Sequence, residues 1–271
     1  MEKLIITAAP TGSVPRKSRT PHVPVTSEEI ADCALRCEEA GASILHIHVR
    51  DAQENPSDDP ELFAGVLDKL RGKTGLILQI STGGRAGTDL DSRTKRLRFS
   101  PEMASLTTGS VNFPTTAYCN PPDLVTALAK EMKRLGIKPE MEVFDLSMID
   151  NALRLQENGL ARAPLHFNFV MGLPGAMSAR VEHLVHCRFC LPPEATWTVS
   201  GIGPAQLSLG VHALLMGGHV RVGLEDNIYF KKGELATNEG LVRRMAEISR
   251  TLGREVASPN EARLILGLQE S

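Results

Sequence analysis

His46 and His48 lie two positions apart in a segment whose other residues are isoleucine, leucine and valine. If that segment is a strand, both imidazoles point to the same face, because side chains alternate along a strand. Two buried imidazoles are costly without a polar partner, and a divalent metal supplies one. Hydrogen-bonded core histidines are the alternative explanation, but the spacing favours a metal, and zinc is expected.

Glu225 is the expected third ligand. It would share one face of the segment 219–225 with Arg221 and Gly223, and the glycine leaves room beside whatever binds there. Two histidines and one carboxylate leave coordination positions open, as a catalytic zinc requires. A salt bridge from Glu225 to Arg221 or Arg50 is the alternative.

A second group of metal-binding residue types is closely spaced: His183, His186, Cys187 and Cys190. The spacing is compatible with zinc, but the group is crowded into an expected helix and the loop that follows it. No second Cys-x2-Cys pair completes a zinc ribbon or finger. We therefore interpret this group as helix packing with free thiols.

The metal ligands must be positioned by regular elements, and short β-rich segments alternate with amphipathic ones along the whole chain. The expected strands are 4–10, 43–49, 76–82, 103–109, 140–145, 165–171, 196–201 and 219–224. Thr26 to Glu29 predict a capping box that begins a helix ending at Gly41. Helical spacing also marks 123–136, 204–217 and 238–252.

Strands that are each followed by a helix favour parallel pairing with right-handed crossovers. We expect an α/β fold, a closed (β/α)8 TIM barrel, with residues 1–271 as a single domain. An open doubly wound sheet is the alternative, but its nucleotide fingerprint is absent after the first strand. Because barrel closure makes the first and last strands neighbours, Glu225 would approach His46 and His48.

Polar residues cluster where the expected strands end and are sparse where the strands begin. These positions are 11–13, 50–51, 81–85, Ser110, Asn112, Glu142, Asp145, 201–203, Arg221 and 225–227. Active sites of such barrels lie at the carboxyl ends of the strands. This asymmetry favours an enzyme over a structural protein.

The bulk composition excludes several classes of protein. The hydrophobic fraction of 42%, the charged fraction of 23% and the net charge of -2 are ordinary for a globular protein. No long basic run indicates nucleic acid, and no apolar run is long enough for a bilayer. The N-terminus lacks a signal-peptide layout, and the five cysteines are an odd number. We expect a reduced, cytoplasmic protein.

Five motifs together resemble the β-keto acid cleavage enzymes, whose prototype acts on 3-keto-5-aminohexanoate. They are HIHVRD, STGG, GSVNF, EVFD and VRVGLEDN, in the family's order and spread over essentially the whole chain. The resemblance implies a zinc-dependent barrel, usually a homotetramer. It also implies conversion of a β-keto acid and acetyl-CoA into acetoacetate and a new acyl-CoA.

The resemblance assigns roles to particular residues. It implies zinc ligands at His46, His48 and Glu225, a catalytic arginine and aspartate at Arg221 and Asp226, and substrate-carboxylate contacts near Ser81, Gly84, Ser110 and Asn112. The prototype has a glutamate just past its Thr-Gly, where it meets the substrate's amino group. Here Val14 occupies that position, which favours a neutral or anionic substrate side chain.

Four cations are candidates for contacts with CoA phosphates or a second substrate carboxylate: Arg16, Lys17, Arg19 and Arg85. Solvated surface charge is the alternative. Successive backbone amides at 81–84 suit a carboxylate anchor, because glycines allow close approach.

The expected chemistry begins with a metal that lowers the pKa of the C2 protons of a chelated β-keto acid. The Arg221–Asp226 pair would manage that proton, since an arginine alone stays protonated. The enolate would attack acetyl-CoA, and the released thiolate would cleave the adduct in a retro-Claisen step. A metal-dependent aldolase or hydrolase of a small keto acid, acting without CoA, is the alternative function.

Overall fold

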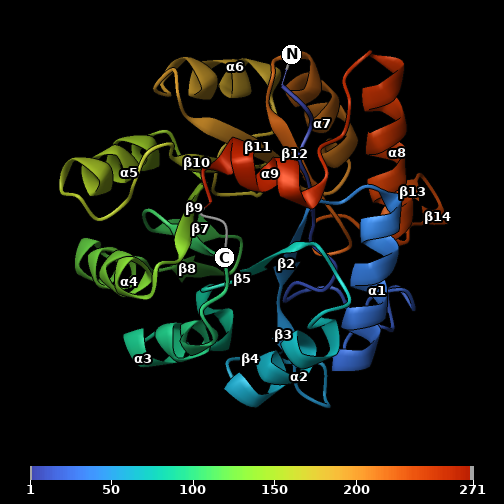
Figure 1. Ribbon diagram of the computed structural model, residues 1–271, viewed down its shortest axis with the longest axis horizontal. Coiled ribbons are helices and arrows are strands. Elements are labelled where there is room, and N and C mark those ends of the chain that lie inside the picture. The colour runs from blue at the N-terminus through green and yellow to red at the C-terminus, as the bar shows by residue number, and fades with distance from the viewer. Residues whose placement is uncertain (1, 269–271) are drawn as a thin grey trace.

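The computed structural model describes residues 2–268, and its centre is a closed barrel of parallel strands (Figure 1). These strands are β1 (Ile6–Ala8), β2 (Ile44–Ile47), β5 (Ile77–Ile80), β6 (Met103–Thr107), β9 (Lys138–Val143), β10 (His166–Met171), β11 (Thr196–Gly201) and β12 (His219–Val222). They follow one another around the barrel in the order β1-β12-β11-β10-β9-β6-β5-β2. The predicted TIM barrel is confirmed.

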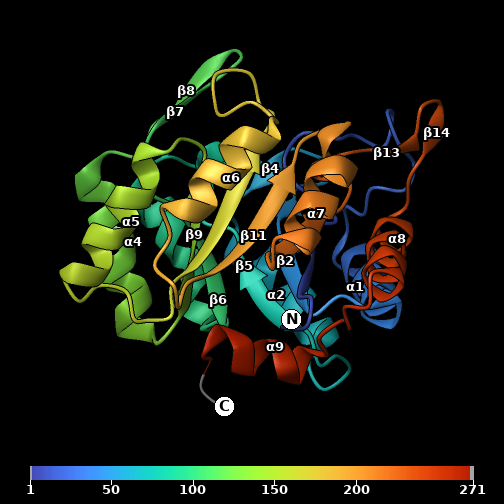
Figure 2. The same ribbon diagram turned by 90° about the horizontal axis from the view of Figure 1, so that it is seen from above.

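Helices surround the barrel on its outer face, and the last of them lies across one end (Figures 1 and 2). They are α1 (Ser27–Ala40), α2 (Pro60–Leu70), α3 (Leu90–Thr94), α4 (Pro122–Leu135), α5 (Ser147–Glu157), α6 (Val181–Phe189), α7 (Ala205–Leu215), α8 (Asn238–Thr251) and α9 (Pro259–Leu266). The predicted capping box is present, because the Thr26 side chain accepts from the Glu29 amide and the Glu29 side chain accepts from the Thr26 amide. In the described part of the chain, none of the helices is both long and apolar enough to cross a membrane.

Short elements that the sequence did not predict follow several barrel strands. They are the hairpins β3 (Val49–Arg50) with β4 (Pro56–Ser57), β7 (Val111–Phe113) with β8 (Thr116–Tyr118) and β13 (Tyr229–Lys231) with β14 (Glu234–Leu235), and the 3-10 turns η1 (Gly84–Ala86) and η2 (Lys95–Phe99). Figure 2 shows the β7–β8 and β13–β14 hairpins at one end of the barrel and α9 at the opposite end.

The end of the barrel at which the strands begin is closed by apolar packing. Inward side chains Ile5, Ile44, Ile77 and Met103 form a buried cluster with Leu266 of α9. The barrel interior is therefore sealed at this end. A functional site is therefore expected at the other end, where the strands end and the hairpins begin.

The predicted strand 219–224 is too long, because β12 ends at Val222 and Gly223 has φ 152. A Cβ on Gly223 would lie 2.1 Å from the Ala9 carbonyl oxygen, so the chain turns there at a position where a side chain would collide with backbone. Glu225 consequently extends from a turn and does not share a strand face with Arg221. The expectation that both lie on one face of a strand is wrong.

Candidate metal and active site

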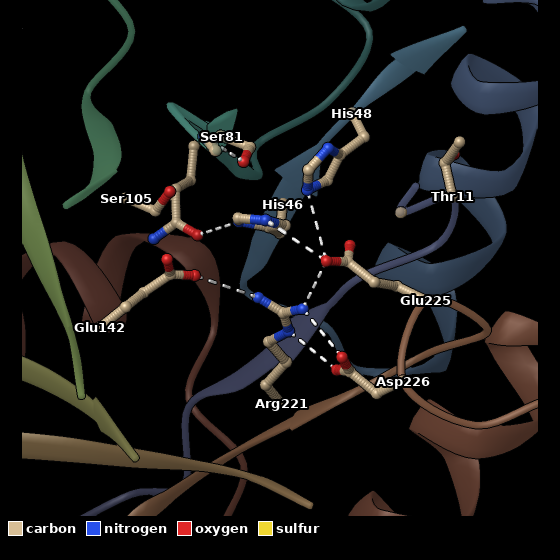
Figure 3. A network of polar contacts seen from close by, with 12 residues as sticks. Thr11, His46, His48, Ser81, Ser105, Glu142, Arg221, Glu225 and Asp226 are labelled. Atoms are coloured by element: carbon tan, nitrogen blue, oxygen red, sulfur yellow. Dashed lines mark hydrogen bonds and ion pairs between the residues drawn. The ribbon is translucent and has the colours of Figure 1, made fainter. Parts of the chain in front are cut away.

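The predicted metal ligands converge at the open end of the barrel. The His48 Nε2 atom lies 3.3 Å and the His46 Nε2 atom 3.9 Å from Oε1 of Glu225. Figure 3 shows the three side chains pointing toward one another. Among residues 2–268 they form the one group of three His, Cys, Asp or Glu side chains whose ligand atoms all lie within 4.8 Å of each other.

Barrel closure brings these ligands together. Strand β1 lies between β2 and β12, and its residue Thr7 is level with Ile44 on one side and Arg221 on the other. The loop after β1 also packs on the third ligand. A Cβ on Gly12, which has φ +55, would lie only 2.4 Å from Cγ of Glu225.

The electrostatic environment of His46 and Glu225 suits the binding of a cation. Burial, helped by the Arg221 charge, lowers the pKa of His46 to about 4, so this imidazole is neutral at pH 7. Its Nδ1 donates to Oε1 of Gln79 over 2.5 Å, because a carboxamide oxygen can only accept, and Nε2 therefore carries the free lone pair. Burial opposes the charge of Glu225, but Arg221 and His48 outweigh it and hold its pKa well below the ordinary value.

One carboxylate oxygen of the candidate ligands is buried without a partner among residues 2–268. Oε2 of Glu225 accepts no hydrogen bond from any described residue. Two imidazoles beside a carboxylate with a free oxygen are the donor set of a catalytic divalent-metal site with open positions. The side chains present therefore fit a bound divalent metal.

The rival group on α6 does not assemble in the described part of the chain. Cys187 is buried and contacts the sulfur of Met177, whereas Cys190 is exposed. The hydroxyl of Ser178 lies 3.2 Å from Nδ1 of His183. These contacts agree with the interpretation of helix packing and free thiols.

Arg221 links the metal ligands to two further carboxylates. Its Nε and Nη2 donate to the two oxygens of Asp226, each over 2.9 Å. Nη2 also lies 2.7 Å from Oε1 of Glu225, and Nη1 lies 3.7 Å from Oε1 of Glu142 (Figure 3). The salt bridge considered as an alternative for Glu225 thus exists beside the ligand cluster.

The charges around Arg221 shift several pKa values. Burial disfavours the Arg221 cation, but the carboxylates of Asp226 and Glu225 outweigh it and raise its pKa. Burial raises the pKa of Asp226 to about 6, although Arg221 favours the anion. Burial likewise raises the pKa of Glu142 to about 7 against the same guanidinium. The raised pKa allows the Glu142 carboxyl group to hold a proton near neutral pH.

A cavity of about 500 Å³ opens over this network. Of the predicted site residues, its wall contains Val14, Ser81, Gly84, His48, Arg221, Glu225 and Asp226. Glu142 also lines the cavity; the sequence placed it at a strand end but assigned it no role. It lies two residues past the fully buried Glu140 in β9, on the same face of the strand, and this spacing was the available signal. Tyr118 lines the cavity as well, from a hairpin that no sequence pattern predicted.

Two of the predicted substrate contacts are not brought to the cavity wall. The Ser110 hydroxyl accepts a hydrogen bond from the Asn120 amide over 2.8 Å. Asn112 is exposed in β7, and its backbone oxygen lies so close to Gly175 that a Cβ there would be 2.0 Å away. The β7–β8 hairpin instead presents Phe113 and Tyr118 to the cavity.

Comparison with known proteins gives one family and several close relatives. The model of a family described as BKACE, beta-keto acid cleavage enzyme, matches residues 3–268. The chain is 48% identical over 269 residues to a 3-oxoadipate:acetyl-CoA acetyltransferase of Cupriavidus necator, covering 97% of this chain and 94% of the relative. It is 45% identical over 274 residues to a 3-keto-5-aminohexanoate cleavage enzyme of Fusobacterium nucleatum, covering 100% of both.

Solved structures with a similar fold include a ternary complex of ObcA with C4-CoA adduct and oxalate. The TM-score is 0.81 at 23% identity, over 93% of this chain and 68% of that one. A type I 3-dehydroquinate dehydratase from Clostridium difficile gives a TM-score of 0.58 at 10% identity, over 93% of both chains. At these identities the similarity establishes the barrel fold alone.

Proposed function

The chain belongs to the beta-keto acid cleavage enzyme family, and on that premise we propose that it converts a β-keto acid and acetyl-CoA into acetoacetate and a new acyl-CoA. The names of the relatives in Cupriavidus necator and Fusobacterium nucleatum support a keto acid substrate, and the former supports acetyl-CoA. The observation that carries the proposal is the contact of one guanidinium, Arg221, with both Asp226 and the candidate ligand Glu225.

We propose that His46, His48 and Glu225 hold a divalent metal, zinc in the first instance. The metal would supply a Lewis acid for the keto and carboxylate oxygens of the substrate, which acidifies the C2 protons between them. The buried Glu225 carboxylate with its unpartnered oxygen supports this assignment.

Arg221 and Asp226 would manage the C2 proton. Asp226 holds both Nε and Nη2 of the guanidinium, so it fixes the position and the charge of Arg221. Removal of the proton leaves an electron pair at C2, which attacks the acetyl carbon of acetyl-CoA and expels the CoA thiolate. The thiolate then attacks the original keto carbon, the C2–C3 bond breaks, and C2 recovers a proton to give acetoacetate.

The remaining polar wall would bind the substrate and its oxyanions. Ser81 and Gly84 lie where a carboxylate can meet a hydroxyl and backbone amides. Glu142, whose pKa burial raises to about 7, suits a hydrogen bond to the oxygen of the attacked keto carbon. The Thr107 hydroxyl donates to Oε2 of Glu142 over 2.8 Å. Oε1 of Glu142 therefore faces Arg221 and the cavity.

The decisive test incubates the metal-loaded protein with a panel of β-keto acids, with and without acetyl-CoA, and measures acyl-CoA by mass spectrometry. We expect acyl-CoA and acetoacetate in equal amounts, and only when acetyl-CoA is present. Turnover without acetyl-CoA would favour the alternative, a metal-dependent aldolase or hydrolase of a small keto acid. That outcome would exclude the transferase.

We also propose a homotetramer, as the family resemblance implies, and a cytoplasmic location. The cysteines of the described chain are all free, which suits a reducing compartment. Light scattering on the purified protein measures the assembly state, and a dimer or monomer would contradict the first proposal.

A further inference from the structure

The wall of the cavity beside Glu225 is formed by the loop that follows β1. Ser13, Val14, Pro15 and Arg19 of this loop all line the cavity. Val14 is 62% exposed, so it offers an apolar surface to whatever occupies the space. This loop therefore faces the part of a substrate that extends away from the reacting carbons.

The loop is held rigidly by one buried arginine. The Arg50 guanidinium donates to three backbone carbonyls of the loop, at Thr11, Gly12 and Pro15, over 2.6 Å in the case of Thr11 and 3.0 Å in the case of Gly12. Arg50 is 3% exposed, so these bonds are shielded from water. The side chains of the loop are consequently presented to the cavity from a fixed backbone.

Two of the three cations of the loop are bonded to other parts of the chain. Arg16 donates to the Gln53 carbonyl over 2.9 Å and to Oδ1 of Asn55 over 3.1 Å. Lys17 is paired with Glu29. Arg19 differs, because its guanidinium makes no hydrogen bond or ion pair with residues 2–268, although it lines the cavity.

Arg85 is the other cavity cation without an acidic partner in the described chain, but it lies at a different place. It directly follows Gly84, the proposed contact for the reacting carboxylate, and its guanidinium carbon lies 5.1 Å from the centre of the Phe113 ring. Arg19 instead shares the β1 loop with Val14 and the backbone that packs on Glu225.

From this placement we propose that the preferred substrate is a β-keto diacid, whose distal carboxylate binds the Arg19 guanidinium while its methylene groups lie against Val14. The proposal rests on the proposed function and names its substrate class. A carboxylate would give Arg19 the charged partner that the chain itself does not supply. The guanidinium fork matches a carboxylate with two parallel hydrogen bonds.

The test compares 3-oxoadipate with 3-oxohexanoate, the monoacid of the same length, using the metal-loaded enzyme and acetyl-CoA. We expect the wild-type protein to prefer the diacid. In Arg19→Met, the ratio of kcat/KM for the diacid to kcat/KM for the monoacid should fall about 10- to 100-fold, the value of a lost charge-assisted hydrogen bond.

Two matched variants separate the loss of the Arg19 charge from the loss of a cation elsewhere near the cavity. Arg16→Met removes a cation of the same loop that is bonded to the chain, and should keep the wild-type ratio. Arg85→Met removes the other cavity cation. A fall of the ratio in Arg85→Met with none in Arg19→Met overturns the proposal, and so does an Arg19→Met variant in which only the KM for acetyl-CoA rises, because the cation would then bind a CoA phosphate.

Calorimetric binding of 3-oxoadipate in the absence of acetyl-CoA keeps this proposal distinct from the proposed function. If the wild-type protein forms no acyl-CoA but binds the diacid more tightly than Arg19→Met does, the reaction is wrong and the substrate class stands. Equal binding by both proteins overturns the role of Arg19 whatever reaction is catalysed.

Discussion

Arg221 and Glu225 form a short ion pair, with Nη2 2.7 Å from Oε1, and the same nitrogen donates to Asp226 over 2.9 Å. A candidate metal ligand and a candidate proton-handling pair therefore share one guanidinium. Because Arg221 is 4% exposed, water screens these charges weakly. A substitution of any one of these three side chains should therefore change the position and the pKa of the other two.

Asp226→Asn should lower kcat by about 100- to 10 000-fold. The amide would keep the shape of the side chain but would no longer compensate or orient the Arg221 cation. Exchange of the C2 protons of the β-keto acid in D2O, measured by NMR without acetyl-CoA, isolates the proton step and should fall in parallel. Unchanged exchange at wild-type metal content would remove Asp226 from that step.

Gln79→Met should weaken metal binding about 10- to 100-fold, because the acceptor that holds Nδ1 of His46 is lost. Metal content after dialysis against a graded chelator measures this effect without an activity assay. His46→Ala is the reference for complete loss of a ligand. Protein purified without chelator that contains no stoichiometric metal, in the wild type as well as in these variants, would refute the metal site.

Glu142 should make the protein less stable as the pH rises toward neutral. Its pKa is about 7 in the folded protein and 4.5 as the ordinary value, so between these pH values the unfolded chain releases a proton that the folded protein keeps. The free energy of unfolding should therefore fall by about 3 kcal/mol from this group over that interval and then level off. Glu142→Gln should lose this slope in urea denaturation series, and an unchanged slope would contradict the assignment.

Gly12→Ala should displace Glu225, since the new methyl group would lie 2.4 Å from its Cγ. Gly233→Ala is a matched control, because Gly233 also has positive φ but nothing within 4 Å of the added Cβ. Both variants should lose about 1 kcal/mol of stability from backbone strain. Only Gly12→Ala should also lose bound metal, and equal metal content in the two variants would show that the contact with Glu225 is tolerated.

The order and type of the barrel elements, and the pairing of His46 with His48, could be predicted from the residue pattern alone. These features follow from local rules: side chains repeat every two residues in a strand, and helix ends carry capping residues such as Thr26 and Gly41. Barrel closure predicted Glu225 as the third ligand, and the polar strand ends pointed to Arg221 and Asp226, whose catalytic roles the motif resemblance implied. The structure brings these three side chains together.

Which polar side chains share the cavity depends on tertiary packing. Glu142 lies near Arg221, whereas the Ser110 hydroxyl bonds the Asn120 amide and Asn112 lies in a hairpin that no sequence pattern predicted. Arg16 and Arg19 look equivalent in the sequence, yet one is bonded to the chain and the other faces the cavity. Such choices depend on barrel closure and on loop contacts between residues distant in sequence, and no local periodicity encodes them.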